Sequence, residues 1–156
     1  MNRAEPIIRQ AQAGDIDGLL PLLQLLFAIE EDFTFDEKRQ RDGLNLLLNS
    51  ATSCIAVADI EGKVVGMGTG QLVISTAEGG LSLLVEDVVV AEEWRRQGIG
   101  GKLLDYLAEW ASEQGASRMQ LFADRTNKAG LDFYCKEGWR QNKLICLRKY
   151  QKKTKP

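Results

Sequence analysis

A short turn rich in arginine and glycine, residues 95–100, lies between an apolar run typical of a β-strand and an amphipathic run typical of a helix. Gly98 and Gly100 lack a Cβ, so a ligand can approach their backbone closely. The first N–H groups of the following helix have no backbone partner, and the helix dipole adds positive charge there. Arg95 and Arg96 can pair with anionic oxygens. The turn therefore predicts a binding site for a phosphate group.

Two common nucleotide-binding loops do not match this turn. A P-loop requires a serine or threonine after its lysine, whereas Leu103 follows Lys102. A dinucleotide fingerprint requires a third glycine, again at the position of Leu103. A second glycine-rich run, residues 66–71, ends in Gln71 instead of glycine and continues as strand-like sequence. Both nucleotide interpretations fail, and a plain surface turn remains the alternative to a phosphate site.

The absence of histidine narrows the possible chemistry. None of the 156 residues is histidine, which excludes serine–histidine–aspartate triads, cysteine–histidine pairs and histidine-based metal sites. The three cysteines, Cys54, Cys135 and Cys146, form no metal-binding spacing, and their odd number favours a reducing compartment. We therefore expect no metal and a cytoplasmic location. Proton transfer falls to carboxylates, tyrosine, cysteine, lysine or ordered water.

The composition is that of one acidic globular domain. Apolar residues make up 44% and charged residues 27%, and the net charge is −2, which argues against broad binding to nucleic acid or anionic membranes. No stretch approaches the ~20 apolar residues of a membrane span, and the first residues lack a signal-peptide pattern. We expect a single domain over residues 1–156, with a basic solvated tail at about 152–156.

The elements that must position the turn follow from hydrophobic periodicity. A short strand is expected at residues 6–12, followed by a leucine-rich helix that begins near Asp15, where Pro21 predicts a kink or a later start. A second helix at about 36–49 carries Leu44, Leu47 and Leu48 on its apolar side. Residues 53–59, 63–75 and 81–90 are β-rich and predict a three-stranded meander.

The remaining elements surround and follow the turn. Apolar residues from 103 to 111 recur at helical spacing and predict a helix that ends at Gly115. A strand at 117–124, a short helix at 127–138 and two final short strands within 139–150 complete a mixed α/β domain around one sheet.

Residues 127–139, NKAGLDFYCKEGW, provide the second motif. With this segment downstream of the R-x-x-G-x-G turn at 95–100, the chain resembles the GCN5-related N-acetyltransferase (GNAT) superfamily. The resemblance covers essentially the whole chain, although the first third matches by pattern alone. It implies a central, mostly antiparallel twisted sheet of about seven strands with a splayed parallel pair, and about four helices. It also implies acetyl-CoA as co-substrate.

The resemblance assigns roles to the turn and to the strand before it. The turn binds the pyrophosphate of acetyl-CoA, and the freed strand backbone pairs with the pantetheine arm. Core packing of the valines and a helix cap at Asn127 are structural alternatives that also fit. The implied cofactor-binding residues are Val88, Val89, Val90, Arg95, Arg96, Gln97, Gly98, Ile99, Gly100, Gly101, Lys102, Asn127 and Tyr134.

The same resemblance points to the residues that move protons. Tyr134 is implied as the general acid beside the cofactor sulfur, because a phenol with the ordinary pKa of about 10 is protonated at neutral pH. Glu86 is the expected base, with Asp87 or a water relay as alternatives. Strand alternation predicts that Glu86 and Asp87 lie on opposite faces and that Glu86 shares its face with Val88 and Val90. A covalent route through Cys135 is the weaker mechanism.

The acceptor end is implied near residues 30–37, where acidic side chains surround two phenylalanines. An acidic, aromatic mouth attracts a cationic amine, although a solvated loop is the plain alternative. We expect Glu30, Glu31 and Phe33 to bind a small-molecule amine, as in the aminoglycoside or aminoalkylphosphonate branches of the superfamily. Alternatives are a protein or peptide acetyltransferase and a non-catalytic acyl-CoA-binding module. A homodimer is expected by family analogy.

Overall fold

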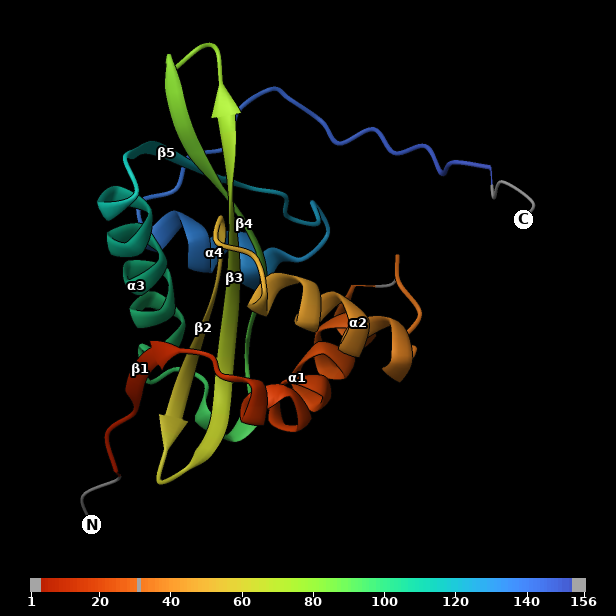
Figure 1. Ribbon diagram of the computed structural model, residues 1–156, viewed down its shortest axis with the longest axis vertical. Coiled ribbons are helices and arrows are strands. Elements are labelled where there is room, and N and C mark those ends of the chain that lie inside the picture. The colour runs from red at the N-terminus through yellow and green to blue at the C-terminus, as the bar shows by residue number, and fades with distance from the viewer. Residues whose placement is uncertain (1–3, 31, 153–156) are drawn as a thin grey trace. The chain divides into compact units, whose positions relative to one another are not determined.

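The computed structural model describes residues 4–30 and 32–152 and divides into two compact units, Met1–Leu121 and Phe122–Pro156. Each unit is described by itself. Among the described residues, the first unit contains a sheet and three α-helices, and the second contains one short α-helix (Figure 1).

A five-stranded sheet forms the centre of the first unit. Its strands lie side by side in sequence order: β1 Ile7–Gln10, β2 Ser53–Ile60, β3 Lys63–Ser75, β4 Gly80–Val90 and β5 Ala116–Leu121. The first four pair antiparallel, and β4 pairs with β5 in parallel. The predicted meander and parallel pair are confirmed. The described part of the chain forms five strands, however, where about seven were expected.

Three helices cover the two faces of this sheet (Figure 1). α1 Ile16–Ile29 and α2 Glu37–Leu48 lie on one face, and α3 Ile99–Glu113 lies on the other. The leucines of α1 form a buried cluster with Leu44 of α2 and with Val57, Met67 and Val89 of the strands. Each fully buried leucine or valine side chain contributes about 1.5–3 kcal/mol, so this burial is the main source of stability.

α1 continues through Pro21. The 3₁₀ turn Ala13–Asp15 leads directly into α1 at Ile16, so the later start considered for this helix is wrong. Proline removes one backbone hydrogen bond from the helix, but the Pro21 side chain is exposed while Leu19, Leu20 and Leu22 are buried. Packing of these leucines against the sheet outweighs the lost bond, since tertiary burial dominates helix stability.

The glycines of β3 let α3 lie close to the sheet. A Cβ at Gly66 would stand 3.2 Å from Leu103 Cδ1, and one at Gly68 would stand 3.3 Å from Leu107 Cδ1. Both leucines are completely buried. The glycine-rich run at 66–70, which fails as a nucleotide loop, therefore serves to seat the helix that follows the phosphate turn.

The second unit contains α4 Lys128–Lys136. The Asn127 side chain caps this helix by accepting a hydrogen bond of 3.0 Å from the Gly130 N–H, and Gly138, with φ of 88°, follows its end. Residues 139–152 form no strand, so the prediction of two final strands is wrong for the described residues. A strand requires a ladder of hydrogen bonds with a neighbouring strand, and residues 139–152 belong to none of the ladders that the described residues form.

None of the helices over residues 4–30 and 32–152 has both the length and the apolar composition that crossing a lipid bilayer requires.

Candidate active site

The predicted phosphate turn joins the end of β4 to the start of α3. After the short 3₁₀ helix Glu92–Trp94, two residues of the turn have left-handed backbones: Arg96 with φ of 61° and Gly98 with φ of 77°. No side chain caps the first N–H groups of α3. These groups and the dipole of a fifteen-residue helix are suited to an anion, so the local geometry fits a pyrophosphate.

The two arginines of the turn differ in role. Arg95 Nε donates a hydrogen bond of 3.0 Å to the Val90 carbonyl oxygen, which braces the turn against the end of β4. Arg96 and Lys102 are exposed, so their charges can reach a bound anion. Leu103, by contrast, is completely buried beneath the helix. The residue that fails both nucleotide patterns is thus part of the core.

β4 and β5 separate before β4 ends. Their pairing stops at Val85 and Leu121, and β4 continues for five residues, through Val90, beyond that point. The Ala91 N–H bonds to the Val65 carbonyl oxygen on β3, so by the alternation of an antiparallel ladder Val90 directs its backbone groups away from β3. The bond from Arg95 to the Val90 oxygen agrees with this direction. Among the described residues, β4 therefore runs on past its pairing with β5, and the Val90 carbonyl oxygen in this part accepts a hydrogen bond from Arg95.

A β-bulge interrupts β4 at the acidic pair. Thr69 of β3 stands opposite Glu86, yet Met67 stands opposite Val89, so one extra residue is inserted in β4. Asp87 takes the additional bend with φ of 53°. The bulge shifts the alternation by one position, and Glu86 shares its face with Val89. The prediction that Glu86 shares a face with Val88 and Val90 is wrong for this reason.

The Asp87 carboxyl is half-buried and carries a strongly perturbed pKa. Burial, followed by the negative charges of Glu86 and Glu30, raises the pKa of Asp87 to about 7. A hydrogen bond with the Thr69 hydroxyl acts in the opposite direction and lowers the pKa of Asp87. The same hydroxyl donates to the Glu86 carbonyl oxygen at 3.1 Å. Thr69 lies opposite Glu86 in the ladder and therefore on the same face of the sheet, and its side chain also contacts the Asp87 carboxyl. The carboxyls of Glu86 and Asp87 are therefore not on opposite sides of the sheet. The expectation of opposite faces is wrong here as well.

Two of the three residues predicted to bind the acceptor, Glu30 and Phe33, lie within the described part of the chain. Glu30 caps the end of α1, and its charge reaches Asp87. The Phe33 ring packs at a tilt against Phe27, with 5.4 Å between the ring centroids, whereas Glu31 lies outside the described residues. Two other acidic residues of this stretch have structural roles: Asp36 caps α2, and Glu37 pairs with Arg41 at 3.0 Å. The acidic character of the mouth thus rests on fewer residues than its sequence suggests.

In the second unit, Tyr134 lies on α4 between two other aromatic side chains. Its ring centroid is 5.1 Å from that of Phe133 and 5.9 Å from that of Trp139. These contacts fix the ring within its own unit and allow a positioned phenol. Cys135, the next residue, is exposed.

A family model for the acetyltransferase (GNAT) family matches residues 20–139, which is most of the chain. The chain belongs to this family. Members of the GNAT family use acetyl-CoA, and the names of the relatives indicate an N-acetyltransferase.

Three similar proteins place this GNAT chain among known acetyltransferases. A thialysine N-epsilon-acetyltransferase from Sus scrofa is 31% identical over 140 residues, which cover 84% of this chain and 82% of that protein. An aminoglycoside acetyltransferase from an uncultured soil metagenomic sample, solved in complex with sisomicin, is 25% identical with a TM-score of 0.75, covering 95% and 97% of the two chains. An aminoglycoside N-acetyltransferase in complex with CoA shares the fold alone, at 13% identity and a TM-score of 0.83, covering 98% of each chain.

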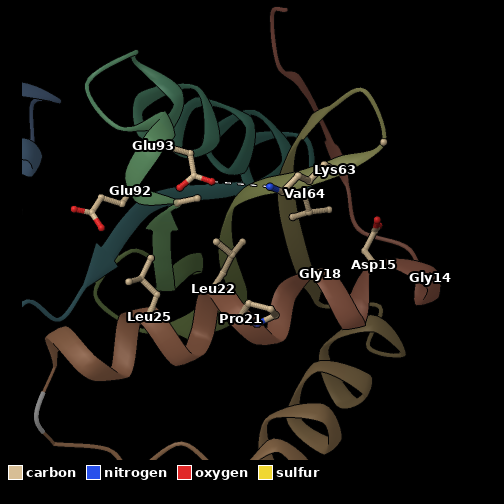
Figure 2. Close-up of a pocket in the computed structure, with 12 residues that line it drawn as sticks. Gly14, Asp15, Gly18, Pro21, Leu22, Leu25, Lys63, Val64, Glu92 and Glu93 are labelled. Atoms are coloured by element: carbon tan, nitrogen blue, oxygen red, sulfur yellow. Dashed lines mark ion pairs between the residues drawn. The ribbon is translucent and has the colours of Figure 1, made fainter.

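A groove of about 630 Å³ opens beside α1, and its lining includes Ala91, Glu92 and Glu93, which follow the end of β4. Figure 2 shows Pro21, Leu22 and Leu25 of α1 facing Val64 across it. Lys63 and Glu93 form an ion pair of 3.9 Å at its edge. The lining thus combines apolar side chains of α1 and β3 with charged residues, among them Asp15 and Glu92.

Sequence reasoning missed two features of this GNAT site. Thr69 is a completely buried hydroxyl that contacts the acidic pair, and its only signal is a polar residue within an apolar strand. The bulge at Asp87 carries a weaker signal, two adjacent acidic residues in an otherwise apolar run. An added residue in one strand cannot be recognised until the partner strand is known.

Proposed function

We propose that this chain transfers the acetyl group of acetyl-CoA to a primary amine of a small molecule. The observation that carries the proposal is that, in a GNAT-family chain, β4 continues past its pairing with β5 and leads through an arginine-bearing turn to a helix start without a side-chain cap. When bound, acetyl-CoA supplies an activated acetyl thioester. Everything else in the reaction falls to residues of this chain.

The turn and the β4 edge would hold the donor. The first N–H groups of α3, together with Arg96 and Lys102, bind the pyrophosphate, while the bond to Val90 keeps Arg95 in place as a brace. Val88 and the N–H group of Val90, whose carbonyl oxygen accepts from Arg95, offer backbone groups to the pantetheine arm. Val89 differs from them, since its side chain is buried and its backbone follows the ladder toward β3. We therefore assign to Val89 a role in positioning the strand.

We place the general base at Asp87, although the sequence favoured Glu86. An ammonium substrate must lose a proton before its nitrogen can attack, and a base works best with a pKa near the working pH. Asp87 has a pKa of about 7 and a half-buried carboxyl, whereas Glu86 is exposed. Glu86 then serves as a negative charge that raises the pKa of Asp87 and attracts the cationic amine, directly or through water.

Tyr134 is proposed as the general acid that donates a proton to the departing sulfur. The support is its place on α4 within the family motif and the aromatic contacts that hold its ring. Asn127, which the sequence assigned to the cofactor, uses its side-chain oxygen to cap α4, so its amide nitrogen is the group that remains for a ligand contact.

The relatives support a small cationic acceptor. One relative is named for thialysine, and one solved neighbour was determined with sisomicin. Glu30 and Phe33 lie on the acidic, aromatic stretch after α1 and are proposed to bind the amine, together with Glu31.

A screen of acceptors tests the proposal directly. Thiol release from acetyl-CoA is measured with lysine analogues, aminoglycosides, small polyamines and lysine-containing peptides, each against a control without acceptor. We expect release with one of the small amines and none with peptides. Release with peptides alone would favour the protein acetyltransferase, and no release despite a rise in Tm with acetyl-CoA would favour a non-catalytic binding module. No rise in Tm at saturating acetyl-CoA would contradict the donor site itself.

A further inference from the structure

Thr69 places a hydroxyl group beside the apolar core of the first unit. It is 1% exposed and lies in β3, opposite Ile55 of β2 and two residues after Met67. Residues paired across a ladder, and residues two apart on one strand, share a face of the sheet. Ile55 and Met67 both belong to the buried cluster that packs against α1. A hydroxyl in such surroundings is costly unless it is hydrogen-bonded, so its partners indicate what it does.

Over the described residues, the polar contacts of this hydroxyl lie on β4. It donates a hydrogen bond of 3.1 Å to the Glu86 carbonyl oxygen, and it also contacts the Asp87 carboxyl. A hydroxyl has one hydrogen and two lone pairs, so it donates to one of these two acceptors at a time. Thr69 therefore contacts both the peptide that joins the acidic pair and the carboxyl that follows it.

The Glu86 carbonyl oxygen belongs to the peptide group whose orientation sets the φ angle of Asp87. That angle is 53°, in the left-handed region that residues other than glycine rarely adopt. The bulge creates this bend, because Gly68 of β3 stands against both Asp87 and Val88 of β4. A left-handed residue persists only where its surroundings hold it, and the bond from Thr69 holds the peptide that precedes it.

The second contact acts on the charge of the Asp87 carboxyl. Burial, and then the negative charges of Glu86 on the same strand and Glu30 at the end of α1, raise the pKa of Asp87. The hydrogen bond with Thr69 lowers that pKa, because a donor stabilises the ionised carboxylate. When the carboxyl is protonated it becomes a donor itself, and the Thr69 hydrogen is free for the Glu86 carbonyl oxygen. One hydroxyl thus serves both protonation states.

We propose that Thr69 is a positioning residue that acts through Asp87. Its hydroxyl fixes the peptide before Asp87, and it donates to the carboxylate when Asp87 is ionised and to the Glu86 carbonyl oxygen when Asp87 is protonated. The inference rests on the proposed function, in which the proton that the amine loses passes to Asp87. Thr69 keeps its own hydrogen throughout and is assigned no contact with acetyl-CoA or the amine.

The titration of the Asp87 carboxyl tests the proposal without an acceptor. It is followed by NMR on the full chain labelled with carbon-13 at the aspartate carboxyls, and Asp87→Asn assigns the signal. Thr69→Val removes the hydroxyl at nearly constant volume, and we expect the midpoint to rise by about one pH unit, since the carboxylate loses a hydrogen bond. Thr69→Ser keeps the hydroxyl, so its midpoint should stay at the wild-type value.

Two further variants control this comparison. Thr69→Ala against Thr69→Ser repeats the loss of the hydroxyl in a smaller side chain, and this pair decides the question if Thr69→Val does not fold. Ser82→Ala removes another hydroxyl of the same sheet that is 1% exposed but lies outside the bulge, and it should leave the Asp87 midpoint unchanged. A purely structural role for Thr69 would lower Tm in the variants without moving the midpoint, and that result would overturn the proposal.

The pH–rate profile, measured with an amine that the acceptor screen identifies, supplies an independent readout. The rise in rate through about pH 7 should move upward in Thr69→Val together with the carboxyl midpoint, and Thr69→Ser should retain the wild-type profile. A midpoint that moves while the profile does not would support the action of Thr69 on Asp87 and contradict Asp87 as the base. Absence of acetyl transfer to every amine would contradict the proposed function and leave the NMR test of Thr69 in force.

Discussion

At the scale of single residues, Asp87 combines three unusual properties: a left-handed backbone, a partly buried carboxyl and a pKa of about 7. Its pKa is raised in the folded chain, so the unfolded chain loses this proton at lower pH. Stability therefore falls as the pH rises from about 4 to about 7 and stays lower above that range. Asp87→Asn removes this cost, roughly 2 kcal/mol after allowance for partial exposure, and should raise Tm by roughly 5 °C at pH 8 and little at pH 4.

Activity gives a second test at this pair of carboxyls. Asp87→Asn should lower turnover and abolish the rise in rate through about pH 7, because the ionised carboxylate is the active form. Glu86→Gln is the matched variant: removing its negative charge lowers the pKa of Asp87, so the rise should persist and move to lower pH. A wild-type pH–rate profile for Asp87→Asn would move the base to another group.

Tyr134→Phe removes the hydroxyl group and keeps the aromatic ring, so it tests the hydroxyl separately. The phenylalanine keeps the contacts with Phe133 and Trp139, so the fold and the affinity for acetyl-CoA should be retained. Loss of a general acid lowers turnover by about 10²–10⁴-fold. Steady-state rates and acetyl-CoA titration by calorimetry separate the two effects, and an unchanged kcat would exclude Tyr134 from proton transfer.

At the scale of elements, the fit of α3 onto β3 decides where the phosphate turn lies. Gly66→Val places side-chain atoms where Leu103 Cδ1 is 3.2 Å from the position of a Cβ, and the Val89 carbonyl oxygen is 3.4 Å away. Overpacking of this kind costs about 1–3 kcal/mol. We expect a lower Tm and, because the start of α3 moves, a weaker binding of acetyl-CoA.

Gly43 of α2 offers the control for this substitution. An added Cβ there meets nothing within 4 Å, and alanine is a better helix former than glycine by about 1 kcal/mol. Gly43→Ala should therefore raise Tm and leave acetyl-CoA affinity unchanged in the same two assays. Equal affinities for the Gly66→Val variant and the wild type would show that the turn does not depend on the seating of α3.

At the scale of the whole molecule, one ionic cluster ties the start of the chain to the sheet. Arg9 of β1 contacts Asp15 at 2.8 Å and Asp59 of β2 at 3.0 Å. The hydrogen bond from Arg9 is the main cause that lowers the pKa of Asp15. This contribution to stability is present above the ordinary aspartate pKa, about 4, and is lost as the pH falls below it.

Removal of the arginine tests this cluster. Arg9→Met retains much of the side-chain volume but leaves two carboxylates facing each other, and we expect a loss of about 1–2 kcal/mol at neutral pH, since the cluster is part-buried. The loss should be smaller at pH 3, below the ordinary aspartate pKa of about 4, because the carboxyls of the unfolded chain are then largely protonated. Urea denaturation at both pH values measures it, and an equal loss at the two would assign the effect to packing.

Much of this fold follows from the sequence because local signals suffice for it. Apolar periodicity located the helices and the meander, and the glycine–arginine turn located the start of α3. Pro21 led to the wrong prediction of a later helix start, because helix propensity describes an isolated helix. In the folded chain, packing of the buried leucines of α1 against the sheet stabilises the helix through Pro21. The final strands failed for a related reason: residues 139–150 have strand-like residues, but a strand exists only where a neighbouring backbone accepts it.

The sequence by itself excluded histidine chemistry, and it led to the predictions of a phosphate-binding turn and of a tyrosine and two carboxyls as the groups that move protons. Only the tertiary structure decided which carboxyl has the matching pKa. That choice depends on a bulge created by the register of β3 against β4, on burial of the carboxyl and on charges from Glu86 and Glu30. The chemical groups that a chain offers follow from its residue types alone. The pKa of such a group depends on burial, charges and hydrogen bonds, which come from parts of the chain that are distant in sequence.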